Sequence, residues 1–115
     1  MSLQEERNPK MIANNLKPFH PIHPGEVLKD ELEYRGISQR GLARQMGISY
    51  SVLNEVLNGK RALNTELALM MEAALDVDAA PLLAMQNEYD MLMAQRNPSF
   101  MEKLRQIRQI AAALL

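Results

Sequence analysis

The stretch SQRGLARQMGISYSVLNEVLNGKR, from Ser38 to Arg61, decides how this chain folds. Apolar residues recur in it at helical spacing, in two short groups on either side of Gly47. The two groups are Leu42, Ala43 and Met46, then Leu53, Val56 and Leu57. Ser38 and Ser49 each precede a group, where serine caps a helix N-terminus, and Gly47 can take the left-handed conformation that ends a helix. The stretch therefore predicts two short helices joined by a tight turn.

One helix is predicted before this stretch. It begins at Pro24, because a proline loses nothing at the first helical position, and it runs to about Tyr34 and stops at Gly36. Ile22 and Val27 have the spacing of a hydrophobic staple. The side chains expected to face inward are Val27, Leu28 and Leu32.

Three helices are predicted after the stretch. Asn64 caps TELALMMEAAL (65–75), which is apolar nearly all round and should be central. A second helix begins near Pro81, and a third has Asn97 as its cap and Pro98 at its first position. The second carries one stripe, which consists of Leu82, Gln86, Tyr89 and Met93. No segment alternates as a strand does, so the fold class is all-α.

Length and composition narrow the class of protein. The chain has 115 residues, enough for one domain, and it has no cysteine, which excludes disulfides, cysteine metal sites and thiol nucleophiles. No apolar run approaches the roughly 18 residues of a membrane span, so we expect a cytoplasmic protein without a membrane partner. The expected organisation is a flexible N-terminal arm (1–19), a helix-turn-helix domain (20–95) and a C-terminal helix (96–115).

The charge is unevenly distributed, although the net charge is only -1. Residues 35–61 carry five basic side chains and one acidic one, whereas residues 62–95 carry six acidic side chains and no basic one. A protein that binds phosphate needs a local positive face rather than a positive total. The alternative is chance clustering on a solvated surface, and charge alone does not decide between the two.

Two short helices joined by a glycine-containing turn, with small polar residues at the start of the second, form the helix-turn-helix arrangement of DNA-binding proteins. The alternative is a helical hairpin within a bundle. Residues 37–61 resemble the phage-repressor-type (Xre) domains, including Gln39 at the start of the first helix. The segments HPGEVLKDEL, NGKRALNTELAL and LLAMQNEYDM resemble the HigA-type antitoxins, and this resemblance covers 23–93. Gly41 departs from the family pattern, because many relatives carry an acidic residue at this position.

This resemblance implies a five-helix, lambda-repressor-like domain followed by the C-terminal helix. It also implies a homodimer that binds its own operator, a double-stranded DNA, represses its operon and neutralises a small ribonuclease toxin of the HigB type. A stand-alone Xre-type repressor without a toxin is the first alternative. A structural adaptor that uses the same bundle to bind proteins is the second.

The candidate DNA-contacting residues lie at the starts of the two helices and just after the second. They are Gln39, Arg40, Ser49, Tyr50, Ser51, Asn54, Glu55, Asn58, Lys60 and Arg61. The resemblance implies phosphate and base-flanking contacts for Gln39 and Arg40. Asn54 and Glu55 are of the types that pair with adenine and with cytosine in the major groove. Asn58 is equally well placed to cap the helix end.

Other chemistry is not expected. His20 and His23 in HPIHP cannot complete a tetrahedral metal site without further ligands, so no metal is predicted. No nucleophile–base pair, glycine-rich phosphate loop or paired carboxylates are recognisable, so we expect neither an enzyme nor a cofactor.

The C-terminal helix is predicted to form the dimer. Its apolar residues recur in steps of four, three, four and three, as in a coiled-coil seam. They are Phe100, Leu104, Ile107, Ala111 and Leu114. The alternative is that this helix folds back and completes the monomer core. The acidic residues between Glu66 and Asp90 are a plausible complement to a basic toxin, or they serve solubility alone.

Overall fold

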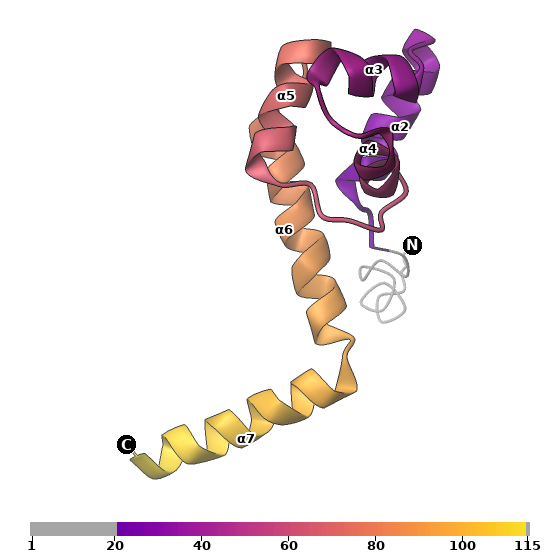
Figure 1. Cartoon of the computed structure of the whole chain (residues 1–115). Helices are drawn as coiled ribbons and strands as arrows, with labels where there is room; N and C mark the ends of the chain where they lie inside the picture. The colour runs from indigo at the N-terminus through magenta and orange to yellow at the C-terminus, as the bar shows by residue number, and fades with distance from the viewer. Residues whose placement is uncertain (1–20, 115) are drawn as a thin grey trace, which may run out of the picture.

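The computed structural model describes residues 21–114, so the arm predicted over residues 1–19 lies outside the described part of the chain. Residues 21–114 form six helices and no strand, which confirms the all-α prediction. The helices are α2 (Pro24–Arg35), α3 (Gln39–Met46), α4 (Tyr50–Leu57), α5 (Thr65–Leu75), α6 (Ala79–Gln95) and α7 (Pro98–Leu114). Figure 1 shows α2 to α5 gathered around the first half of α6, while α7 leaves this body at an angle.

Helix α2 starts and stops at the predicted signals. Pro24 takes the first helical position, and Gly36 ends the helix in the left-handed conformation with φ 69°. The N-cap residue is His23, whose ring accepts a hydrogen bond from the backbone of Gly25. Glu26 completes a capping box by accepting from the His23 backbone N–H, so both residues satisfy donors that a helix start otherwise leaves open.

The inward face of α2 differs from the prediction at one residue. Leu28 and Leu32 are buried as expected, but Val27 is 42% exposed, so its inward placement was wrong. Its predicted staple partner Ile22 is 54% exposed as well. Adjacent helical residues point about 100° apart, and the face that packs on α4 and α6 is the one that carries Leu28 and Leu32. Val27 is therefore rotated toward solvent.

Helices α3 and α4 have the predicted caps. The Oγ of Ser38 accepts from the N–H of Gly41 at 3.0 Å, and Ser49 caps α4 in the same way. A Cβ on Gly41 would lie 2.8 Å from the Ser38 Oγ, so the glycine leaves room for this close cap. Gly47 has φ 71°, as the turn between the helices requires. The helix-turn-helix is thereby confirmed.

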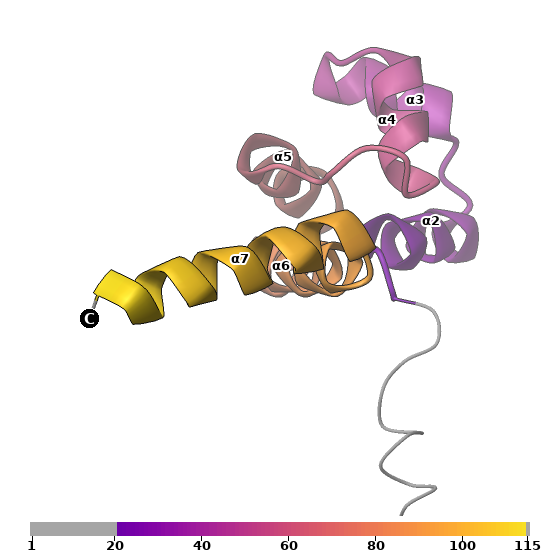
Figure 2. The same cartoon turned by 90° about the horizontal axis from the view of Figure 1, so that it is seen from below.

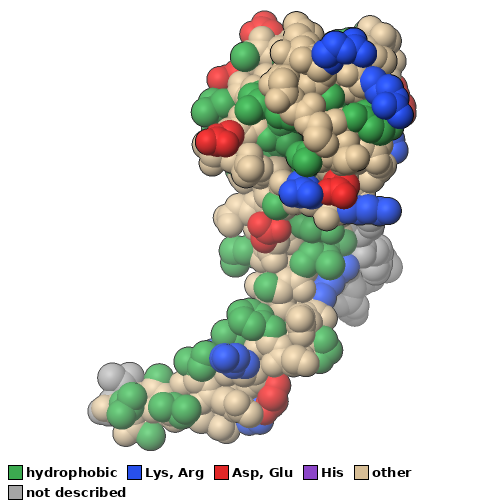
Figure 3. Space-filling view, viewed as in Figure 1, with side chains coloured by type: hydrophobic (Ala, Val, Ile, Leu, Met, Phe, Trp, Pro, Cys, Tyr) green, Lys and Arg blue, Asp and Glu red, His purple; other side chains and the backbone are tan. Residues whose placement is uncertain are grey.

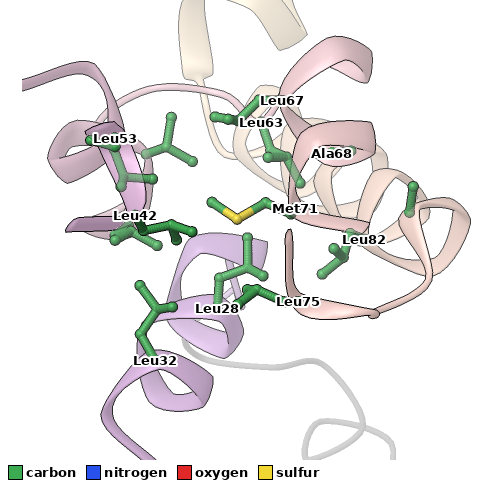
Figure 4. Close-up of a cluster of buried hydrophobic side chains, with 14 residues drawn as sticks. Leu28, Leu32, Leu42, Leu53, Leu63, Leu67, Ala68, Met71, Leu75 and Leu82 are labelled. Carbon is green, nitrogen blue, oxygen red and sulfur yellow. The ribbon is translucent and has the colours of Figure 1, made fainter. Parts of the chain in front are cut away.

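The hydrophobic core lies between α5 and the other helices of the body. Met71 on α5 is fully buried, and Figure 4 places it among leucines from α2, α5 and the segment before α5. Helix α5 packs on both α6 and α3. Its central position was predicted correctly, although its outer face remains open because Leu69 is 52% exposed. The core thus fixes α3 and α4 on one side of the body.

Helix α6 begins earlier than predicted and is buried over only part of its length. It starts at Ala79 rather than near Pro81, because the Glu72 carboxylate accepts from the Ala79 N–H at 3.0 Å. In the predicted stripe, Gln86 is buried, whereas Met93 is 45% exposed. The second half of α6 therefore extends beyond the body.

Helix α7 begins at the predicted cap, where the Asn97 side chain accepts from the Phe100 N–H at 3.1 Å. None of its described residues is buried. Figure 1 shows it running away from α2 to α5, and in Figure 2 its C-terminal half projects beyond the other helices. The alternative in which it folds back and completes the monomer core is therefore wrong.

Candidate nucleic-acid interface

The predicted DNA-contacting residues come together on the side of the body formed by α3 and α4. Arg40, Tyr50 and Ser51 are exposed at the N-terminal ends of these helices. Ser49 is exposed too, but its Oγ is engaged by the N–H of Val52 at 3.1 Å, so its side chain acts as a helix cap. The free N–H groups and partial positive charge of a helix start favour a phosphate nearby. This side of the body therefore suits a nucleic-acid backbone.

Asn54 and Gln39 form a bridge between the two helices. The Asn54 Nδ2 donates to the Gln39 Oε1 at 2.9 Å, and both side chains are half-buried. An asparagine amide has two N–H donors and one carbonyl acceptor. The bridge uses one donor, so the orientation of the Asn54 amide is fixed while its oxygen keeps its capacity to accept from a base.

Arg40 is held against Tyr50. Its guanidinium carbon lies 4.1 Å from the centroid of the Tyr50 ring, which is a cation–π contact. The contact restrains a long side chain that would otherwise sample many rotamers. It places one positive charge over the junction between the starts of α3 and α4.

Glu55 and Arg61 pair with each other. The Arg61 guanidinium lies 2.8 Å from the Glu55 carboxylate, with about half of each side chain exposed. The sequence placed both residues among the candidate DNA contacts, with Glu55 suited to a base, but it did not reveal that they share a salt bridge. The pair is locally neutral, so Arg61 offers a phosphate less net charge than a lone arginine would.

Asn58 ends α4 and connects it to α2. As the C-cap, its Nδ2 donates to the Asn54 carbonyl at 2.9 Å, and its Oδ1 accepts from the Lys29 Nζ at 2.9 Å. The cap role weighed for Asn58 is thereby confirmed. Lys60 follows in the exposed segment after α4. Lys29 brings a positive charge to this end of the interface, and it was missed because it lies on another helix.

The charge pattern of the sequence becomes a difference between two sides of the molecule. Figure 3 shows Lys and Arg side chains mostly over the α3 and α4 side of the body, while Asp and Glu side chains alternate with hydrophobic ones over the α5 side. Glu66, Glu72, Asp76 and Asp78 are all exposed. A surface divided in this way presents one face to a polyanion and repels it from the other.

The motifs HPGE, which begins at His23, and Q-x-x-Y-D, which begins at Gln86, contain residues whose roles could not be predicted from the sequence. Gln86 is buried, accepts from the Leu63 N–H at 2.8 Å and donates to the Asp90 carboxylate at 2.9 Å. His23 is 2% exposed and lies edge-on to Tyr89, with ring centroids 4.9 Å apart. His20, the other histidine of HPIHP, lies outside the described residues. The only available signal was the unusual HPGE and Q-x-x-Y-D spacing.

Known proteins share both the sequence and the fold. The helix-turn-helix family matches residues 28–82. Virulence-associated protein I of Dichelobacter nodosus is 36% identical over 77 residues, which cover 66% of this chain and 71% of that protein. The uncharacterised HTH-type transcriptional regulator YddM of Escherichia coli (strain K12) is 30% identical, over 67% of this chain and 81% of that one.

The solved structure of the Pseudomonas aeruginosa antitoxin HigA with the higBA promoter has a TM-score of 0.64 and 30% identity, over 78% of this chain and 94% of that one. The chain belongs to the Xre-type helix-turn-helix family, and its fold is the DNA-binding fold of the HigA-type antitoxins.

Two further features are absent from residues 21–114. No helix in this range combines the length and apolar character needed to cross a membrane. Within the same range, no three His, Cys, Asp or Glu side chains are grouped so that they could hold a metal ion.

Proposed function

We propose that this protein is an antitoxin that binds its own operator DNA, represses its operon and neutralises a ribonuclease toxin. The observation that carries the DNA-binding part is the Asn54–Gln39 bridge at 2.9 Å, next to the restrained Arg40. Such a bridge holds an amide ready for a base edge without an ordering cost at the moment of binding. Helix α4 enters the major groove, and the start of α3 faces the phosphates.

The DNA site is assigned from these side chains. Asn54, Ser51 and Tyr50 meet base edges, while Arg40, Lys60 and Lys29 meet phosphates. The HigA structure that shares this fold contains its promoter, which supports the same use of the α3 and α4 side here. Glu55 repels phosphate, so it contributes specificity rather than affinity.

The homodimer is built by α7. Phe100 is 42% exposed, Ile107 49% and Leu114 81%, and an isolated helix of this length is marginal in water. A groove of about 430 Å³ on α6, lined by Ile22, Met85, Tyr89 and Leu92 among others, offers an apolar surface for the same interface. Helix α6 carries two acidic and no basic residues, while α7 carries three basic and one acidic, so α7 of a second copy is attracted to α6.

The toxin binds the acidic α5 side. A ribonuclease needs a basic surface for its RNA, and an acidic antitoxin surface complements it. Reversing Glu66 and Asp78 to Lys, both exposed, should slow toxin association by about 10-fold at low salt, because opposite charges steer the encounter. Stopped-flow association rates measure this, with thermal unfolding as a check on the fold. A rate equal to that of the wild type at low salt would place the toxin elsewhere.

Gel-shift titration with the upstream DNA of its own gene tests the whole proposal. A shift at low salt that weakens at higher salt, together with an adjacent reading frame for a small basic protein that the chain inhibits, is the expected result. A shift without such a toxin would leave the stand-alone repressor, which the similarity to a transcriptional regulator favours. The absence of any shift at low salt would leave the protein-binding adaptor.

A further inference from the structure

The HPGE segment brings α2 unusually close to the end of α4. Gly25 lies in the first turn of α2, and a Cβ built on it would be 1.9 Å from the carbonyl oxygen of Val56. Only glycine allows this approach, since no real Cβ comes so near a backbone oxygen. The contact places the residue before α2, His23, directly beside the segment that follows α4.

The His23 ring contacts that segment on one side. Gly59 has φ 73°, and a Cβ built on it would lie 3.6 Å from Cγ of His23, so the ring lies close to this backbone. The backbone of Arg61 is also near enough to the ring to act on the pKa of His23 by raising it. Its Nδ1 accepts from the Gly25 N–H at 2.9 Å. A neutral imidazole that accepts at Nδ1 carries its proton on Nε2, which is then the donor.

Helix α6 also contacts the ring. Tyr89 meets His23 at an interplanar angle of 79°, an edge-on arrangement that aromatic rings favour. From the same helix, Gln86 holds the N–H of Leu63 at 2.8 Å. The segment from Gly59 to Leu63 is therefore fixed near its start through His23 and at its end through Gln86.

We propose that His23 is a positioning residue for operator binding, which holds the segment 58–61, and with it Lys60 and Arg61, in the conformation that meets the phosphates. The effect of His23 on DNA affinity rests on the proposed DNA-binding function. The ordering of segment 58–61 by His23 can be tested without DNA. Residues that order a flexible segment before binding reduce the entropy lost on association. His23 itself is 2% exposed and does not reach the DNA.

His23→Asn separates positioning from helix capping. Asparagine is a good N-cap, so α2 keeps its start, but the ring contacts with Gly59, Arg61 and Tyr89 are lost. Without DNA, amide exchange should accelerate by about 10-fold at Gly59 and Lys60, whose N–H groups bond to Val56 and Glu55, and remain unchanged in α5. With operator DNA, affinity should fall about 10-fold and the salt dependence should flatten.

Tyr89 provides a second, matched pair of variants. Tyr89→Leu removes the edge-on ring contact and should reproduce both effects of His23→Asn in weaker form, while Tyr89→Phe keeps the ring and should behave as wild type. If His23→Asn folds and its amide exchange at Gly59 and Lys60 is unchanged, the positioning role is overturned. If His23→Asn does not fold, unchanged exchange in Tyr89→Leu overturns it instead. Faster exchange in His23→Asn, combined with a wild-type protein that never binds its promoter, would instead overturn the proposed function.

Discussion

The proposed base recognition depends on single side chains whose orientation is fixed before DNA arrives. Asn54 reaches the α4 surface while its amide is held by Gln39, whereas Ser51 is exposed and Ser49 serves as a cap. A side chain that is both restrained and able to accept a hydrogen bond is a better reader than one that must be ordered on binding. Asn54 is thus the residue on which sequence preference should depend most.

Asn54→Ala should lower affinity for the operator by about 10-fold or more and leave affinity for random DNA unchanged. A good pair of hydrogen bonds to a base contributes about 1–3 kcal/mol of discrimination. Fluorescence anisotropy with operator and scrambled duplexes at equal salt measures both affinities. Asn87→Ala, an exposed asparagine on α6, is the control and should change neither. Equal losses on both duplexes would remove Asn54 from the set of base readers.

A second prediction at the same scale concerns pH. Burial lowers the pKa of His23 below its ordinary value of 6.5, against the Arg61 backbone hydrogen bond and the charges of Asp90 and Glu26, which act to raise it. The unfolded chain therefore binds this proton more readily, so the neutral ring contributes stability that is complete above pH 6.5 and is lost as the pH falls toward the lower folded-state pKa.

The midpoint of thermal unfolding should accordingly decrease as the pH falls from 6.5 to about 5, a range in which carboxylates hardly titrate. In His23→Asn the curve should be flatter over this range. Two curves of equal slope would mean that His23 is not the group responsible.

At the scale of helices, the sequence is informative wherever a signal is local. The caps at Ser38, Ser49 and Asn97 and the turn at Gly47 involve partners within four residues, and all four were predicted. The start of α6 at Ala79 was not predicted, because the carboxylate that accepts from the Ala79 N–H belongs to Glu72 on the preceding helix.

The same reason explains what was missed in the candidate site. The contacts of His23 with Gly59 and Tyr89, and that of Lys29 with Asn58, join residues far apart in the sequence. Periodicity and capping rules predict only contacts between residues that are close in the sequence. The residue types at the candidate interface were therefore readable from the sequence, whereas the bridges that restrain them were not.

The basic side chains of the candidate interface should contribute unequally to nonspecific binding. Arg40→Ala or Lys60→Ala should weaken binding to every duplex and reduce the slope of log K against log salt by about 0.9, the value for one phosphate contact. Arg61→Ala should reduce it less, because Glu55 already neutralises Arg61 in the free protein at 2.8 Å. Titrations at four salt concentrations provide the slopes. Lys103→Ala, exposed on α7, is the control with unchanged slope, and an equal effect of all four changes would contradict this assignment.

At the scale of the whole molecule, the body and α7 are separate in their packing. The core is complete within α2 to α6, while no described residue of α7 is buried. A helix of this length with an exposed apolar face is only marginally stable in water unless that face is buried. Two recognition helices must lie about 34 Å apart to meet successive turns of the major groove, and a single body offers only one such helix. The free apolar face of α7 is thus the part of the molecule suited to fixing that spacing.

Leu104→Glu combined with Ile107→Glu should therefore give a folded monomer with weak operator binding. The body should unfold at nearly the wild-type temperature, because neither side chain belongs to its core. Operator affinity should fall by about 10²- to 10⁴-fold, the range expected when two linked contacts become one. Sedimentation velocity provides the oligomeric state. Gln109→Glu with Ala113→Glu adds the same charge off the seam and should stay dimeric. A seam variant that remains a dimer would mean that the groove on α6, and not the α7 seam, holds the two copies together, and Met85→Glu would then be the variant that separates them.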